Sequence, residues 1–300
     1  MTEVTSVFNY SILITTTRGD RSSIAATPQS TENMTLNLND DLFLQKLDFY
    51  LSGIILLMVC LLGLLCNLLV VVVLTHRSMR SSTNSFLLAL ALFDSMVLLC
   101  TTFLICFPPL SSIYSSLIFP HIVAYIYPLA LLAQTCTIWI TVSFTVERYI
   151  AVTHPLKASS MCTIKRARLT TVLVVTISVI YNISRWFEYR SVKVYHTDEL
   201  NNTAPVLIPN TRLPTFQVMP TQLEQNKIYE TTYFSVLYLT VMCIIPILLL
   251  GTLNTFLIVA VKRSQKERRN MSNHNTSKEN NITIMLVSVV VVFIICQVST

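Results

Sequence analysis

Long stretches without charge limit the folds open to this chain more than any other feature of its sequence. Residues 49–75 contain no charged side chain, and from 81 to 146 the only formal charge is Asp94. A helix needs about 20 mostly apolar residues to cross the hydrocarbon core of a bilayer. Because lipid offers the backbone no hydrogen-bond partner, such stretches cross a membrane as helices. The pattern therefore predicts several membrane-spanning helices.

Composition agrees with this prediction, since 53% of the 300 residues are hydrophobic and 12% are charged, about half the charged fraction of a soluble domain. Pro108, Pro109 and Pro120 predict a turn outside the apolar core, between the second and third spans. The expected fold class is all-α, a multi-pass membrane helical bundle. Six spans are expected, at about residues 49–75, 84–107, 122–148, 168–187, 231–261 and 281–300.

Basic residues are concentrated on one side of the predicted spans. Segments 76–83, 147–168 and 262–281 hold 13 of the 21 Lys and Arg residues and three of the 15 acids, whereas the opposite side holds eight bases and eleven acids. This bias predicts that the N-terminus lies on the outer side of the membrane. Short juxtamembrane clusters of this kind contact anionic lipid. We therefore expect membrane lipid, and no nucleic acid, as the partner of this charge.

The N-terminal segment 1–46 is polar and is expected to be a disordered extracellular tail, followed by a helical domain at 47–300. No basic region precedes a short apolar core, so the first span is expected to act as its own uncleaved insertion signal. Asn9, Asn33 and Asn201 lie in N-x-S/T motifs on the predicted outer side, and they are the expected glycosylation sites.

Three residues interrupt the apolar spans. Asp94 lies in the middle of a span, where a carboxylate is costly unless it is paired or faces an internal cavity. It is either a cation or proton site inside the bundle or a buried acid satisfied by hydroxyl groups. Asn67 is expected to hydrogen-bond to a neighbouring helix. Pro246 is expected to kink or loosen its helix, because proline removes a backbone donor.

The sequence Glu147-Arg148-Tyr149 stands at the predicted cytoplasmic end of the third span. An arginine in such a place often extends its charge to the membrane surface and needs no specific partner. Alternatively, Arg148 pairs with an acid on another helix, and Glu279 lies at the inner end of the sixth span. An ion pair that joins two helices and can break is the kind of element that a two-state switch requires.

Five motifs in order resemble those of rhodopsin-like (class A) G-protein-coupled receptors. They are Asn67 in LGLLCNLLV, Asp94 at the end of LALALFD, the segment ERYIAVTHPL, Pro246 in the fifth span, and FIICQ at 293–297. Within that family the chain is similar to FMRFamide-receptor-like neuropeptide receptors, through YPLALLAQTCTIWITVSFTVERYIAV, PLKASSMCTIKRARL and YNISRWFEY. The resemblance runs from about residue 49 to 300. It implies a bundle of seven helices, with this sequence ending inside the sixth.

The resemblance implies roles for residues in the interior of the bundle. Asp94 and Thr137 would hold a sodium ion, and no other metal or cofactor is expected. Ile138, Pro246 and Phe293 would form a transmission cluster below the ligand.

The resemblance also implies a switch at the inner membrane face, made of Glu147, Arg148, Tyr149 and Glu279. Arg148 would leave Glu147 and Glu279 when the inner end of helix six swings out. The opened bundle would then admit a heterotrimeric G protein.

An extracellular peptide of the RFamide type is the ligand that the resemblance implies, bound between the outer ends of helices three to seven. The residues expected in its pocket are Tyr127, Gln134, Glu188 and Gln297. Glu188 would pair with the arginine of such a peptide. Alternatively, Glu188 is a solvated loop acid that Arg185 or Arg190 neutralises.

The sequence departs from the family where the second outer loop is usually joined to helix three by a disulfide. No cysteine lies between residues 185 and 230, and Val123 stands about where the helix-three cysteine is expected. The loop is therefore expected to be held by its own packing. Since helix seven is not in the sequence, the chain is expected to be either a fragment or a truncated, non-signalling isoform that modulates a full-length partner.

Two other classes of protein, transporters and enzymes, fit the sequence less well. Transporters place ionisable residues at mid-bilayer and often contain inverted repeats, but here Asp94 is the one such residue and no repeat is evident. An enzyme is not expected either, because the sequence contains no metal-ligand spacing, nucleophile elbow or phosphate-binding loop.

Overall fold

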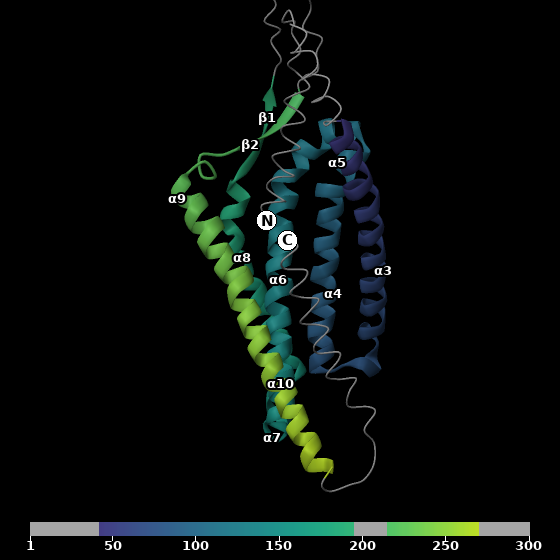
Figure 1. Ribbon diagram of the computed structural model, residues 1–300, viewed down its shortest axis with the longest axis vertical. Coiled ribbons are helices and arrows are strands. Elements are labelled where there is room, and N and C mark those ends of the chain that lie inside the picture. Colours follow the sequence, from purple (N-terminus) through teal and green to yellow (C-terminus); the bar gives the residue numbers. More distant parts are fainter. Residues whose placement is uncertain (1–41, 195–214, 270–300) are drawn as a thin grey trace, which may run out of the picture.

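The computed structural model describes residues 42–194 and 215–269, which form a helical bundle with a β-hairpin at one end (Figure 1). The predicted all-α membrane bundle is confirmed, because five helical stretches are long and apolar enough to cross a membrane. They are Leu42–Thr75, Ser82–Leu110, Tyr114–Thr153, Ile164–Phe187 and Lys227–Lys262. The sixth expected span, the polar tail and the glycosylation candidates Asn9, Asn33 and Asn201 lie outside the described residues.

The spans combine α-helices with short 3-10 and π-helical segments. The first three spans and the turn after the first comprise η1 Phe49–Ile55, α3 Leu56–Thr75, η2 Arg77–Met79, α4 Ser82–Thr101, η3 Thr102–Cys106, α5 Phe107–Leu110, η4 Tyr114–Ile118 and α6 Phe119–Thr153. The remainder comprises α7 Pro155–Met161, α8 Ile164–Asn182, η5 Ile183–Phe187, β1 Tyr189–Val194, β2 Thr215–Pro220, α9 Lys227–Tyr229, η6 Glu230–Ile244 and α10 Ile245–Arg269.

The break between the second and third spans is shorter than the three prolines predict. Pro108 and Pro109 lie inside α5, Pro120 lies in the first turn of α6, and Ser111 alone between these helices has no helical assignment. Proline fits the first turn of a helix, because the N–H groups there have no acceptor within the helix. The chain therefore breaks at Ser111, and the three prolines lie in the helical turns on either side of this break.

Side-chain caps fix where two helices begin at the end of the bundle opposite the hairpin. The Ser81 hydroxyl accepts a hydrogen bond from the backbone N–H of Asn84 (3.1 Å) at the start of α4. Thr163 caps α8 in the same way, through the N–H of Arg166 (3.4 Å). Such caps satisfy donors that have no partner within the helix, and they set the register of each span.

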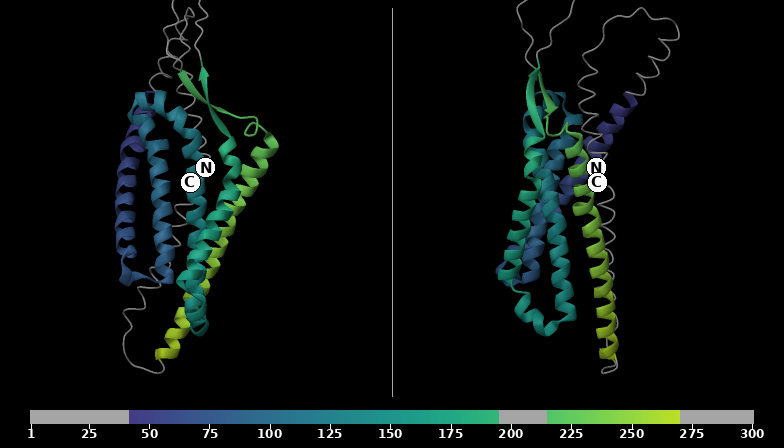
Figure 2. Two further views of the ribbon diagram at one scale, coloured as in Figure 1. Left: turned by 180° about the vertical axis from the view of Figure 1, so that it is seen from behind. Right: turned by 90° about the vertical axis from the view of Figure 1, so that its left-hand side faces the viewer.

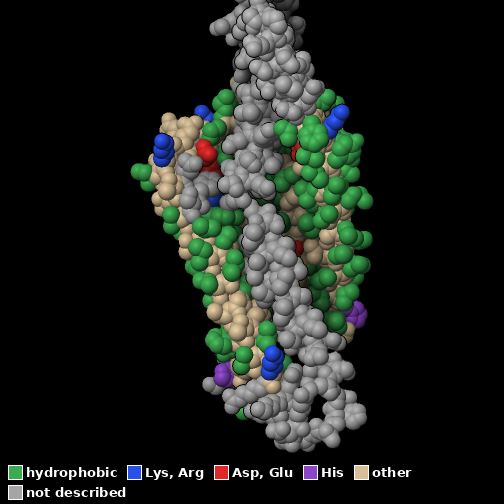
Figure 3. All heavy atoms as spheres, viewed as in Figure 1, with side chains coloured by type: hydrophobic (Ala, Val, Ile, Leu, Met, Phe, Trp, Pro, Cys, Tyr) green, Lys and Arg blue, Asp and Glu red, His purple; other side chains and the backbone are tan. Residues whose placement is uncertain are grey.

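Helix α6 is the centre of the bundle. It packs against α4, α8 and α10, and one core cluster joins Phe86, Cys136, Ile140 and Ala167 from three of these helices. Figure 2 shows α3 at one edge and the long fifth helix, η6 with α10, at the other. On the face seen in Figure 3, hydrophobic side chains cover the flanks of the described helices, and most charged ones lie near the two ends. This distribution suits a lipid surround.

The hairpin is a feature that the sequence did not predict. Strands β1 and β2 pair antiparallel, with a register that runs from Tyr189 opposite Pro220 to Val194 opposite Thr215. The hairpin lies over the end of α6 where that helix begins (Figure 1). Val218 from β2 and Tyr189 from β1 pack there in one apolar cluster with Tyr127. The loop after the fourth span therefore covers one end of the bundle.

Candidate functional site

Asp94 of α4 and Thr137 of α6 meet halfway along the bundle. The Thr137 hydroxyl donates a hydrogen bond to Oδ1 of Asp94 (2.8 Å), and both residues are half-buried. The structure thus brings together the two residues that the resemblance assigns to a sodium site. The same contact agrees with the alternative in which hydroxyl groups satisfy the acid.

Two of the three expected transmission residues are buried where α6 meets the fifth helix. Ile138 packs in a cluster with Tyr238 and Met242 from η6. Pro246 is fully buried at the start of α10, directly after the π-helical segment η6. The wider π-helical winding ends where proline removes a backbone donor, which agrees with the loosened helix expected there. Phe293 lies outside the described residues.

The Glu147-Arg148-Tyr149 sequence lies near the end of α6 opposite the hairpin. Glu147 is 8% exposed, and its two carboxylate oxygens have no hydrogen-bond partner among the described residues. The Arg148 guanidinium instead lies 5.2 Å from the centroid of the Phe144 ring, and the Tyr149 ring lies 6.4 Å from that of Phe256 on α10.

The expected ion pair between Arg148 and Glu147 is not among those that the described residues form. Consecutive helical side chains project in different directions, whereas residues three or four apart are neighbours. This geometry explains why Arg148 covers Phe144, four residues earlier, instead of reaching Glu147. The other expected partner, Glu279, lies outside the described residues.

Of the expected pocket residues, Tyr127 and Gln134 lie on α6, and Gln297 lies outside the described residues. Tyr127 is 6% exposed and packs with Val123, Leu131 and Val218. Its ring meets that of Tyr189 edge to face, with centroids 5.6 Å apart. Gln134 is half-buried two turns further along the helix. The hairpin therefore covers the outer part of the expected pocket.

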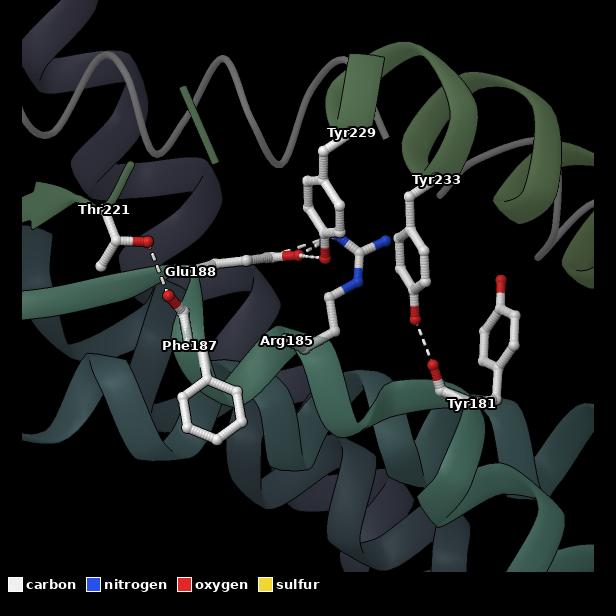
Figure 4. A network of polar contacts seen from close by, with 7 residues as sticks. All are labelled: Tyr181, Arg185, Phe187, Glu188, Thr221, Tyr229 and Tyr233. Atoms are coloured by element: carbon white, nitrogen blue, oxygen red, sulfur yellow. Dashed lines mark hydrogen bonds and ion pairs between the residues drawn. The ribbon is translucent and has the colours of Figure 1, made fainter. Parts of the chain in front are cut away.

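Glu188 is fully buried at the end of the fourth span (Figure 4). Nη1 of Arg185 donates to both of its carboxylate oxygens, at 3.0 and 3.3 Å. The Tyr229 hydroxyl donates to Oε1 at 2.8 Å. Burial raises the pKa of the Glu188 carboxyl, while Arg185 and the hydrogen bond from Tyr229 act in the opposite direction. Glu188 is therefore not the solvated acid of the alternative interpretation, but Arg185 does pair with it.

A stack of tyrosine rings extends this network from the fourth span to the fifth. The Tyr233 ring stacks on Tyr229 (centroids 5.2 Å apart) and on Tyr181 (5.7 Å). The Arg185 guanidinium lies 4.6 Å from the centroid of the Tyr233 ring, a cation–π contact. The Tyr233 hydroxyl donates to the backbone carbonyl of Tyr181 (Figure 4). Arg185 was among the expected partners of Glu188, whereas Tyr229 and Tyr233 were not, because no local pattern links them to residues more than 40 positions away.

Comparison with known proteins identifies relatives among peptide receptors. The chain is 32% identical to the FMRFamide receptor of Drosophila melanogaster, over 83% of this chain and 44% of that protein. It is 28% identical to the FMRFamide peptide receptor frpr-18 of Caenorhabditis elegans, over 80% and 53%. It is 35% identical to the human thyrotropin-releasing hormone receptor, over 45% and 33%. The chain thus spans about half or less of the length of these relatives.

A bundle of membrane helices with these motifs in order defines a class A G-protein-coupled receptor, and not an enzyme. Residues 54–300 match the family model described as serpentine type 7TM GPCR chemoreceptor Srw, and the chain belongs to that family.

Proposed function

We propose that this protein is a plasma-membrane receptor, with its N-terminus outside the cell, that detects a neuropeptide and signals to a heterotrimeric G protein. One observation carries the proposal: α6 joins both candidate sites. It holds Tyr127 under the hairpin and Arg148 near its other end, which are about 30 Å apart at 1.5 Å per residue. Ile138, packed against the fifth helix, lies between them.

The peptide we propose is of the RFamide type. The relatives that support this class are the receptors of Drosophila melanogaster and Caenorhabditis elegans named for FMRFamide. The contact residues proposed are Tyr127, Gln134 and Gln297. Glu188 already pairs with Arg185, so it could pair with a peptide arginine only if that arginine replaced Arg185. Direct contact between Glu188 and the ligand therefore stays a prediction.

The test is to express the receptor from its full coding sequence in cells with a calcium reporter and apply amidated RFamide peptides. We expect a response to the amidated peptide. We expect at least a tenfold loss of potency for the free acid and for the analogue with alanine in place of arginine. A peptide that is equally potent without its arginine or amide would contradict the RFamide assignment, and no response to any peptide of the panel would contradict the ligand class.

Signalling, in this proposal, favours a state in which the inner end of helix six moves outward and Arg148 helps admit the G protein. A sodium ion near Asp94 would favour the resting state. Glu279 is proposed to hold Arg148 at rest, so Glu279→Ala should raise basal signalling. The measurement is reporter output without peptide at matched surface expression, and unchanged output would count against the lock.

A further inference from the structure

The second outer loop, between the fourth and fifth spans, contains no cysteine, yet its hairpin occupies a defined position over α6. The described cysteines are all free. Three sets of noncovalent contacts fasten the hairpin, and two of them involve Glu188.

The first set is the buried ion pair. Arg185 of η5 is 1% exposed and Glu188 is fully buried, so water does not compete for their hydrogen bonds. One nitrogen, Nη1 of Arg185, donates to both carboxylate oxygens, and such charge-assisted hydrogen bonds are stronger than those between neutral groups. The Tyr229 hydroxyl adds a third hydrogen bond from the start of the fifth span. Through this bond from Tyr229, the ion pair joins the beginning of the loop to its end.

The second set uses the backbone at the base of the hairpin. The N–H of Thr221 donates to the carbonyl of Glu188 (2.8 Å). The Thr221 hydroxyl donates to the carbonyl of Phe187 (2.6 Å). Figure 4 shows Thr221 and Phe187 beside the ion pair. Glu188 thus holds the fifth span through its side chain and the hairpin base through its main chain.

The third set is apolar. Val123 of α6 is fully buried and lies in one cluster with Val218 of β2. Val123 stands about where a disulfide to this loop is expected in the family, and here a hydrophobic contact occupies that position.

We infer that Arg185, Glu188 and Tyr229 form a noncovalent clamp that positions the β1–β2 hairpin over Tyr127. These are positioning residues: they act on the ligand site through the loop. The inference rests on the proposed function only in calling the covered space a ligand site. A clamp of this kind depends on charge and geometry, so lysine cannot replace Arg185 without losing the planar guanidinium that stacks on the Tyr233 ring.

The experiment measures loop position without any ligand. Val218→Cys is introduced into the full receptor, which is expressed in cells and labelled with a membrane-impermeant maleimide. With the clamp intact, the introduced thiol is buried and labels slowly. Arg185→Lys and Tyr229→Phe, which change few atoms, should each raise the labelling rate, by about tenfold for Tyr229→Phe, which deletes one hydrogen bond to a charged group. Arg190→Ala is the matched control, because Arg190 is exposed on the same hairpin.

Surface-expressed receptor is counted through an epitope tag, so that loss of folding is separated from loop release. Peptide potency is then measured for the same variants. Equal labelling rates for the clamp variants and the Arg190→Ala control would overturn the inference, whatever the peptide result. Faster labelling with no peptide response from any variant, the parent included, would uphold the clamp and contradict the proposed function instead.

Discussion

Three acids inside or next to the bundle have different surroundings. Glu188 receives hydrogen bonds from Arg185 and Tyr229, and Asp94 receives one from Thr137. Glu147 is buried without a hydrogen-bond partner among the described residues. Removing one member of a buried ion pair leaves the other charge uncompensated, which costs about 3–5 kcal/mol. We therefore expect substitution of these three carboxylates to change the free energy of unfolding by different amounts.

Thr137→Val tests the contact with Asp94. Valine keeps the branched shape of threonine but cannot donate a hydrogen bond, so we expect a loss of about 1 kcal/mol of stability. We also expect a several-fold smaller effect of sodium on peptide potency, because the Asp94 carboxylate loses its orienting partner. Potency is compared in sodium chloride and in choline chloride.

Thr176→Val is the control for this substitution. Its hydroxyl bonds to the carbonyl of Val172 in its own helix, on an exposed face. A Thr137→Val receptor with the full sodium effect would contradict a role for this hydrogen bond in the sodium site.

At this scale the sequence assigned Asp94 and Thr137 to one site, and the two side chains are in contact, while the sodium ion itself stays a prediction. The pairing of Arg185 with Glu188 belonged to one of two alternatives, and the two residues are three positions apart in the chain. The contact of Glu188 with Tyr229 could not be predicted, because it joins residues 41 positions apart.

At the scale of elements, the helices followed from length and apolar character, whereas the hairpin did not. In β1, each face carries both polar and apolar residues: Tyr189, Ser191 and Lys193 alternate with Arg190, Val192 and Val194. Without alternation of polar and apolar residues, a strand gives no periodic signal. Its partner strand is remote in sequence, so pairing depends on the tertiary contacts with α6.

The packing of the hairpin on α6 predicts a disulfide that can be engineered. Val123→Cys combined with Val218→Cys should crosslink under oxidising conditions, because the two valines share one buried cluster. The bond is detected by a mobility shift after proteolysis within the loop.

The matched control replaces Val218→Cys with Val192→Cys. Ser191 pairs with Val218 across the hairpin, so their side chains share one face. Successive residues of a strand point to opposite faces, so Val192 points to the other face, away from Val123. The control pair should stay reduced, and a crosslink in both pairs, or in neither, would contradict the hairpin register.

For the whole molecule, the absence of cysteine from the second outer loop has a direct consequence. An impermeant reducing agent should leave peptide potency within about twofold of the untreated value, since noncovalent contacts position the loop. The measurement is a dose–response curve before and after treatment with a charged phosphine. The crosslinked Val123→Cys, Val218→Cys receptor serves as the comparison, because its engineered bond is reduced under the same conditions. A large loss of potency in the parent receptor would show that a disulfide is needed.

The five spans that the structure describes differ in length, and the fourth is the shortest of them. Ile164–Phe187 has 24 residues, or about 36 Å as a helix, against a hydrocarbon thickness of about 30 Å. The third has 40, or about 60 Å, so it can tilt or project beyond the bilayer. Because Glu188 follows the fourth span directly, we expect lipid headgroups close to the level of the clamp. Bilayer thickness should therefore act on the outer loop: a thicker, sterol-rich membrane would raise its headgroups around this end of the fourth span, and a thinner one would leave the end of the span above them.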